Sequence, residues 1–239
     1  MGLTVIGLHA HYGKSHVLRG VSFDLPPQSI ISLVGRNGSG RSTTLKSILG
    51  IVRPTEGSIV LDGVEQAGRE TRNIVRSGIA YVPEDRLVFP TLTVAENLRM
   101  GHLRAGPDRV AWTVDQMYEY FPRLYERKDT KAGKLSGGEQ QMLTMCRSLL
   151  GNPKVLLLDE PTEGLAPKIV ERLVEAIQDI RRRGVSVLLI EQRLTIALDI
   201  SDRMLVMGHG HIVYDGTPES LRNNANIQRN WLAVSGAAS

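Results

Sequence analysis

The chain has 239 residues, of which 41% are hydrophobic and 23% charged, a composition typical of a globular protein with one large or two small domains. No apolar run is long enough to cross a bilayer, no secretory signal is expected from the N-terminal residues, and the single cysteine, Cys146, excludes an internal disulfide. The net charge at pH 7 is +4, but the basic residues are scattered, which disfavours a nucleic-acid surface.

Three strands are predicted at the start of the chain. Residues 3–5 and 17–25 predict two strands joined by a turn around Gly13, and Tyr12 lies in that turn. A lone aromatic residue in a turn is usually a packing residue. The apolar run at residues 29–34 contains β-branched members and predicts a third strand, which is buried.

A glycine-rich segment connects the third strand to a helix predicted over residues 44–49. The segment consists of Gly35, Arg36, Asn37, Gly38, Ser39, Gly40, Arg41, Ser42 and Thr43. Its glycines let backbone N–H groups converge on an anion at a helix start, as in a phosphate-binding loop. Ser42 stands where a hydroxyl would bind Mg²⁺. The alternative interpretation is a glycine-rich turn without a ligand.

The middle of the chain changes character near residue 89. Before it, residues 55–63 predict a strand, residues 71–77 a short helix, and residues 78–83 a buried strand that ends at Pro83. From about residue 89 to residue 150, apolar residues recur at helical spacing, which indicates a mostly helical insert. This pattern includes Val94, Leu98, Val110, Val114 and Met117.

A serine and two glycines open the last predicted helix of this insert. The segment consists of Leu135, Ser136, Gly137, Gly138, Glu139 and Gln140. Free N–H groups at a helix start can bind an anion, so this is a second candidate phosphate site. A chain with one nucleotide site needs no second phosphate cradle, whereas two copies that face each other do. The alternative is a simple N-cap by Ser136.

The last part of the chain alternates strands with helices, which predicts an α/β fold. The strand at residues 155–160 ends in Asp159 and Glu160. An aspartate there can hold Mg²⁺ through water, and the following glutamate can polarise an attacking water. The alternative is two acids that cap a strand end. Residues 169–180 and 194–200 predict helices, and residues 185–190, 204–207 and 211–214 predict strands.

Two further features have structural interpretations. His9 with His11, and His209 with His211, are each two residues apart, but no third ligand is near in sequence. Surface histidines are therefore expected rather than a metal site. Ile227, Trp231 and Val234 form a C-terminal apolar stripe, for which we expect packing on the main body, with a partner contact as the alternative.

Together, the three motifs resemble those of the ATP-binding subunits of ABC transporters. The Walker A-like loop at residues 35–43, the signature at 135–140 and the Walker B strand at 155–160 stand in that family's order and spacing. The resemblance covers essentially the whole chain. It implies a single ABC ATPase domain over residues 1–239, with a P-loop NTPase (RecA-like) α/β core and an antiparallel β subdomain at 1–88 and 154–239. A helical subdomain at 89–153 carries the signature.

The resemblance also implies roles for individual residues. In that family two subunits dimerise head to tail, and Mg·ATP lies between the loop of one and the signature of the other. Tyr12 would stack on adenine with Val17 beside it, the loop would bind the phosphates, and the signature would contact γ-phosphate across the dimer. The expected catalytic residues are Glu160, as the base, and Gln192. The expected Mg²⁺ ligands are Ser42, Asp159 and Glu84.

Within the family, the chain is most similar to the ATPase subunits for branched-chain amino acids (LivF-type) and their relatives for urea and amides. Residues 81–90, 92–98, 161–167 and 190–192 carry this likeness. Glu84, Gln192 and Ala166 stand where most ABC proteins have glutamine, histidine and aspartate, as in that branch.

This likeness implies an importer for such solutes. The expected partners are a second ATPase subunit, identical or different, two membrane permeases and, indirectly, an external solute-binding protein. The chain would be peripheral, at the cytoplasmic face of the inner membrane. The loop at residues 84–98, with Phe89, is the expected transmission surface. The alternatives are an exporter of lipid or lipopolysaccharide, a soluble ABC ATPase acting on nucleic acid or ribosomes, and a binding-only nucleotide module.

Arg41 departs from every branch, because the motif has lysine at this position. Lysine is a compact charge that fits between the β- and γ-phosphates, whereas arginine keeps the charge on a bulkier fork that can grip phosphate through two nitrogens. We therefore expect ATP binding that is retained but weakened. We expect turnover to be lower by roughly 10²-fold, the effect of misplacing one charge-stabilising group.

Overall fold

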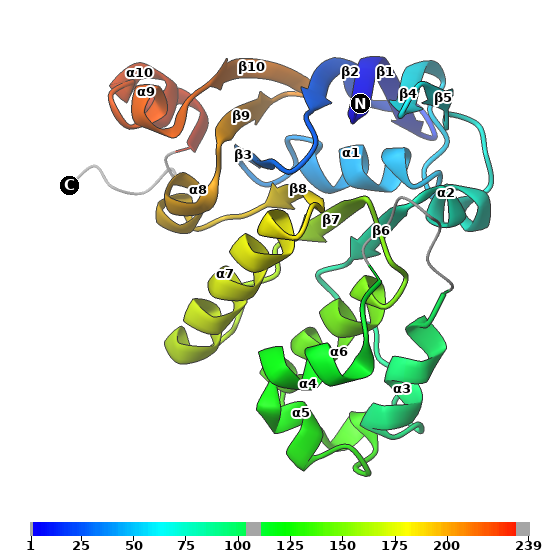
Figure 1. Cartoon of the computed structure of the whole chain (residues 1–239). Helices are drawn as coiled ribbons and strands as arrows, with labels where there is room; N and C mark the ends of the chain where they lie inside the picture. Colours follow the sequence, from blue (N-terminus) through cyan, green and yellow to red (C-terminus); the bar gives the residue numbers. More distant parts are fainter. Residues whose placement is uncertain (1, 104–110, 233–239) are drawn as a thin grey trace.

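The structure is a computed structural model that describes residues 2–103 and 111–232, so Val110 and Val234 lie outside the described residues. Two β-sheets lie one above the other, and a group of helices extends from one side of the larger sheet (Figure 1). No helix in the described ranges is long and apolar enough to span a membrane.

The larger sheet has six strands in the order β10-β9-β3-β8-β7-β6. All neighbours in it run parallel except β10, which is antiparallel to β9 at one edge. The strands are β3 (Ile30–Gly35), β6 (Ile79–Val82), β7 (Val155–Asp159), β8 (Ser186–Ile190), β9 (Arg203–Gly208) and β10 (His211–Gly216). Strands β7 and β8 are buried throughout, as expected for parallel strands covered on both faces.

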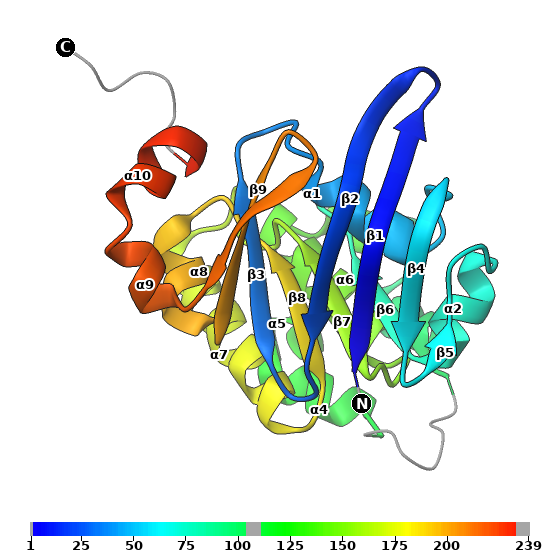
Figure 2. The ribbon, with the colours of Figure 1, turned by 90° about the horizontal axis from the view of Figure 1, so that it is seen from above.

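The smaller sheet is antiparallel, with the order β2-β1-β4-β5 (Figure 2). It consists of β1 (Leu3–Tyr12), β2 (Ser15–Leu25), β4 (Glu56–Leu61) and β5 (Val64–Glu65). The first strand is longer than predicted, so Tyr12 ends a strand instead of lying in a turn. Pairing from Leu3 with Leu25 to Tyr12 with Ser15 makes one long hairpin.

The helices fall into three groups. The first lies beside the smaller sheet and contains α1 (Arg41–Ile48) and α2 (Thr71–Ser77). The second contains α3 (Val94–Gly101), α4 (Val114–Tyr120), α5 (Pro122–Glu126), the 3₁₀ turn η1 (Ala132–Lys134) and α6 (Gly137–Leu149). The third contains α7 (Pro167–Arg182), α8 (Leu194–Ile200), α9 (Pro218–Arg222), α10 (Ala225–Ile227) and the π-helical turn η2 (Gln228–Leu232). Helix α1 begins three residues earlier than predicted, and α9, α10 and η2 were not predicted.

The core is divided by the larger sheet. Alternate residues of each strand point to opposite faces, so Leu156 and Leu158 join the cluster formed with α3–α7. Leu157 instead joins the cluster under the smaller sheet, which also contains Leu45 of α1 and Leu18 of β2. A smaller third cluster contains Val206 and Leu221, with Trp231 packed against it, as predicted for packing of the C-terminal stripe.

Candidate functional site

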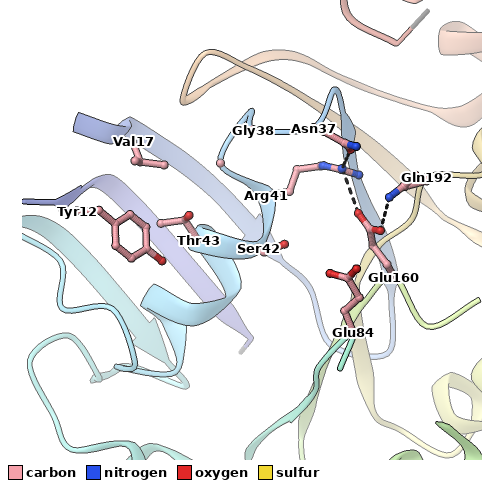
Figure 3. A pocket seen from close by; sticks show the side chains of 11 residues that line it. Tyr12, Val17, Asn37, Gly38, Arg41, Ser42, Thr43, Glu84, Glu160 and Gln192 are labelled. Atoms are coloured by element: carbon pink, nitrogen blue, oxygen red, sulfur yellow. Dashed lines mark hydrogen bonds and ion pairs between the residues drawn. The ribbon is translucent and has the colours of Figure 1, made fainter. Parts of the chain in front are cut away.

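A cavity of about 440 Å³ opens where β3, β8 and β7 end. Because these three parallel strands are neighbours, the segments that follow them meet at one edge of the sheet. The cavity is lined by Tyr12, Val17, Asn37, Gly38, Gly40, Arg41, Ser42, Thr43, Glu84, Glu160 and Gln192 (Figure 3). All of these were predicted site residues.

The glycine-rich loop is shaped by left-handed backbone positions. Gly38 has φ +77° and Gly40 has φ +107°, which side chains disfavour. A Cβ at Gly40 would also lie 2.9 Å from side-chain carbons of Leu18 and Met207. Gly40 therefore allows the loop to pack against these residues and to lead directly into α1. This is the backbone geometry that an anion-binding turn requires.

Arg41 is almost fully buried and bends across the cavity toward Glu160. Its Nη2 lies 3.1 Å from Oε1 of Glu160 and donates to Oδ1 of Asn37 at 3.0 Å. Its Nη1 is buried and has no hydrogen-bond partner within the described part of the chain. A buried, unpaired guanidinium nitrogen that lines a cavity fits an anionic ligand such as phosphate.

Glu160 is held in place by backbone and side-chain contacts. Its φ is +49°, an uncommon value for a residue with a side chain, and its N–H donates to the carbonyl of Ile190 at 3.0 Å. Nε2 of Gln192 donates to its carboxylate. Burial raises the pKa of the Glu160 carboxyl above its ordinary value, although the Gln192 hydrogen bond and the Arg41 charge act in the opposite direction.

Ser42 and Asp159 form a pair of oxygen donors beside Glu160. The Ser42 hydroxyl donates to Oδ1 of Asp159 at 3.0 Å, and Glu84 is exposed at the cavity wall. Hydroxyl and carboxylate oxygens are suitable ligands for Mg²⁺. Among residues 2–103 and 111–232, no three His, Cys, Asp or Glu side chains could hold a metal ion together. Mg²⁺ at this pair would therefore need phosphate or water oxygens as well.

Tyr81 begins one of the segments that carry the family likeness, but no role was predicted for it. Its hydroxyl donates to Oδ2 of Asp159 at 2.9 Å. Burial, with the charge of Asp159, raises the pKa of Tyr81 far above its ordinary value, so the phenol remains a donor. Tyr81 lies on β6, which pairs with β7, the strand that ends in Asp159. Only this pairing of the two strands could have indicated the contact.

Glu191 was also missed. It is buried, accepts from the Thr162 hydroxyl at 2.7 Å, and accepts from the N–H groups of Gln192 and Arg193 at 2.9 Å. These bonds fix the loop that carries Gln192 and connect it to the segment after Glu160. Its position directly after an apolar strand could have indicated such a role.

The aromatic and acidic ends of the cavity lie apart. Tyr12 and Val17 lie on the hairpin side near Thr43, and Glu160 and Gln192 lie at the other end (Figure 3). The Tyr12 side chain is 51% exposed, so its ring is accessible. This order suits a ligand with an aromatic base at one end and phosphates at the other.

The predicted signature lies outside this cavity. Leu135 is buried, and Ser136 caps α6 through a capping box with Glu139. The Glu139 carboxylate accepts from the N–H of Ser136 at 2.8 Å and from its hydroxyl at 2.9 Å. Gln140 donates to the carbonyl of Ala132 at 3.2 Å. The structure thus brings the loop and the Walker B acids together but not the signature.

The histidine pairs lie at the surface, as predicted: His11, His209 and His211 are exposed and His9 is half-buried. Nδ1 of His9 lies 3.0 Å from Nε2 of His16, and the His11 ring stacks on His16 with 4.1 Å between centroids. Hairpin pairing therefore brings a third histidine to the first pair. In the second pair, the His209 ring contacts Trp231, with 5.4 Å between centroids.

Sequence comparisons identify the family. The ABC transporter family profile matches residues 18–163. The chain belongs to the ABC transporter family. It is 43% identical over 222 residues to the high-affinity branched-chain amino acid transport ATP-binding protein BraG of Pseudomonas aeruginosa, with 93% of this chain and 95% of that protein covered.

Other relatives are similar along nearly their whole length. The chain is 37% identical to the probable branched-chain amino acid transport ATP-binding protein LivF of Archaeoglobus fulgidus, with 97% of this chain and 99% of that protein covered. It is 34% identical to the lipopolysaccharide export system ATP-binding protein LptB of Haemophilus influenzae, with 96% of each covered.

Solved structures have the same fold. A nucleotide-free ATP-binding cassette from an ABC transporter superposes with a TM-score of 0.80 at 26% identity, covering 93% of this chain and 94% of that one. A bacterial Atm1-family ABC exporter with ATP bound gives a TM-score of 0.82 at 26% identity, covering 95% of this chain and 41% of that one. The predicted ABC ATPase fold and family are thus confirmed.

Proposed function

We propose that this chain is the ATP-binding and ATP-hydrolysing subunit of an ABC importer for branched-chain amino acids or a related small polar solute. The observation that carries the proposal is the convergence of Arg41, Ser42, Asp159 and Glu160 on one cavity. Similarity to BraG and LivF over nearly the whole chain supports the solute class.

The residues of the cavity divide the work of ATP hydrolysis. The adenine would stack on Tyr12 beside Val17, and the loop N–H groups with Nη1 of Arg41 would bind the phosphates. Ser42 and Asp159, with Glu84 at the wall, would hold Mg²⁺, which neutralises charge on the phosphates when bound. Glu160 would accept a proton from the attacking water, and Gln192 would orient Glu160.

The signature would act on ATP held by a second ATPase subunit. Two facts support this arrangement: the signature does not line the cavity of its own chain, and the N–H groups of Gly137 and Gly138 have no acceptor within the described residues. In a head-to-tail dimer, each cavity would be closed by the opposite signature. ATP binding would then close the dimer, and hydrolysis would open it.

Arg41 would retain ATP binding but slow the reaction. While Nη2 of Arg41 holds Glu160 in an ion pair, the carboxylate is less able to accept a proton, yet Nη1 remains for phosphate. This contact supports the predicted loss of roughly 10²-fold in turnover. Measured ATP turnover also separates an enzyme from a binding-only module, which would show none.

The permeases would contact an apolar groove between the core and the helical group. The groove has a volume of about 400 Å³ and contains the exposed side chains of Leu87, Phe89, Met100 and Leu103. It overlaps the predicted transmission loop at residues 84–98. Through such permeases the chain would be peripheral at the cytoplasmic face of the inner membrane. An external solute-binding protein would act indirectly.

Crosslinking tests the permease contact. Phe89→Cys should crosslink to a permease in the assembled transporter, whereas Val64→Cys, at an equally exposed position on the far sheet, should not. The native Cys146 does not interfere, because it is buried and burial raises the pKa of its thiol. Equal crosslinking at both positions would count against the groove.

The second candidate is the ATPase of a lipopolysaccharide or lipid exporter. It is favoured by the 34% identity to LptB over 96% of the chain. Purification of the assembled complex distinguishes the two. The permeases that copurify identify their genes. For an importer, a solute-binding protein should be encoded beside those genes, whereas an exporter does not depend on such a protein.

A further inference from the structure

Arg86 has an unusual backbone conformation in the loop between β6 and α3. Its φ is +44°, a left-handed value that is rare for a residue with a long side chain. Such a conformation persists only where surrounding contacts fix it, and these positions are often functional. The carbonyl of Arg86 accepts from the N–H of Val88 at 2.8 Å, which closes a tight turn.

The Arg86 guanidinium lies directly on the signature. A Cβ at Gly137 would be 2.0 Å from Nη1 of Arg86, so the guanidinium lies against the glycine and would have to move to admit a side chain there. Nη2 donates to the carbonyl of Glu163 at 3.0 Å, and a Cβ at Gly164 would lie 3.0 Å from the same nitrogen. Arg86 therefore connects its own loop, the signature, and the segment that follows Glu160.

The carboxylate of the signature, Glu139, is already paired. The Glu139 carboxylate occupies the N–H and hydroxyl of Ser136, and Nη1 of Arg127 lies 3.4 Å from that carboxylate. Arg86, in contrast, has no carboxylate within ion-pair distance among the residues that the structure describes. Its hydrogen bond goes to a neutral carbonyl. Arg86 can thus accept an anionic partner at the signature.

We propose that Arg86 binds a terminal phosphate oxygen of the nucleoside triphosphate held in the opposite subunit. The guanidinium and the N–H groups of Gly137 and Gly138 form the phosphate-binding part of the signature half-site. The positive charge offsets repulsion between Glu139 and the incoming phosphate. The inference rests on the head-to-tail dimer proposed above and adds a phosphate-binding residue outside the signature segment.

The two variants of Arg86 separate this role from a structural one. Arg86→Gln keeps a hydrogen-bond donor for the Glu163 carbonyl but removes the charge. Arg86→Lys keeps both a donor and the charge. Arg72→Gln is the matched control, because Arg72 is exposed on α2 and its ion pair with Glu70 is a surface contact.

The experiment uses the full chain carrying Glu160→Gln, so that ATP persists, alone or with its cognate ATPase subunit. Nucleotide affinity is measured at a protein concentration well below the dimer Kd, where the chain is monomeric. Dimerisation is measured by sedimentation velocity with Mg·ATP. We expect Arg86→Gln to raise the dimer Kd about tenfold or more without changing ATP affinity, about the effect of losing a charge-assisted contact. Arg86→Lys and Arg72→Gln should stay close to the parent.

Three outcomes would overturn the proposal. Unchanged dimerisation of Arg86→Gln would show that the charge does not act there. An equal loss of dimerisation in Arg86→Lys would indicate that Arg86 only holds the loops together. Weaker ATP binding by the Arg86→Gln monomer would show that Arg86 acts on the nucleotide bound by its own chain. Failure of the parent to dimerise would refute the dimer itself, an outcome distinct from a loss confined to Arg86→Gln.

Discussion

Arg41 of the Walker loop and Arg86, which lies against the signature, differ in what the guanidinium contacts. Arg41 is buried and held by a carboxylate, Glu160, whose side chain is 7% exposed. Arg86 lies on a glycine and donates to a neutral carbonyl. In the proposed mechanism, a guanidinium that pairs with the proposed base restrains that base, whereas one that contacts only a carbonyl is available to phosphate. The same side chain thus has opposite consequences in the two half-sites.

The largest expected effect is that of replacing Glu160, the proposed base. Glu160→Gln should leave ATP binding intact and slow hydrolysis by about 10²–10⁴-fold, the usual contribution of a general base. The amide can still accept a hydrogen bond from Arg41, so the fold should persist. Single-turnover hydrolysis beside equilibrium ATP binding measures both effects.

The control for this prediction is Glu171→Gln, at an exposed position on α7. It should hydrolyse ATP as the native chain does. Normal hydrolysis by Glu160→Gln would show that the base is assigned wrongly.

Arg41→Lys tests whether the ion pair restrains Glu160. The ammonium has no planar fork that could contact both phosphate and carboxylate in the same way, so we expect ATPase activity to rise by roughly 10²-fold and ATP affinity to increase. Steady-state ATPase assays over a range of ATP concentrations separate the two changes. Arg72→Lys is the exposed control, and no gain in Arg41→Lys would show that the ion pair with Glu160 does not restrain the reaction.

Tyr81→Phe tests whether Tyr81 supports the proposed Mg²⁺ ligand Asp159. Loss of the hydroxyl removes the hydrogen bond to Asp159 and should weaken Mg²⁺ affinity by about tenfold, the lower end of what such contacts contribute. The Mg²⁺ dependence of ATPase activity reports this change. Tyr125→Phe, at an exposed ring, should not alter it, and an equal effect in both variants would remove the assigned role of Tyr81.

The smallest effect concerns pH. Because burial raises the pKa of Glu160, its carboxyl takes up a proton at a higher pH than an ordinary glutamate does. A protonated carboxyl cannot act as a base, so ATPase activity should fall as the pH decreases through that raised pKa and recover above it. The kcat profile of the native chain should show this acidic limb, and residual hydrolysis by Glu160→Gln should lack it. An identical limb in both would assign the titration to another group.

The sequence was sufficient for features that lie in one segment. The glycine-rich loop, the signature and the strand ending in Asp159 and Glu160 each carry their meaning in a few consecutive residues, so the family and the fold could be predicted. The short helices α9 and α10 were missed because five and three residues carry little periodicity.

Contacts between distant segments could not be predicted in this way. The ion pair of Arg41 with Glu160 requires β3 and β7 to end on either side of β8, a strand order that no local pattern reveals. Tyr81 reaches Asp159 for a similar reason, and Arg86 reaches Gly137 only because its loop turns back through a positive φ. The long hairpin likewise brings His16 to His9.

The central claim is that two half-sites on each chain become complete only in a dimer that encloses ATP. Sedimentation of the Glu160→Gln chain with Mg·ATP, with nucleotide content measured in the sedimenting species, tests it most directly. We predict a dimer that retains ATP at both interfaces and dissociates when the nucleotide is removed. A species that stays monomeric and retains no adenine nucleotide at saturating Mg·ATP, even with its cognate ATPase subunit present, would contradict the account.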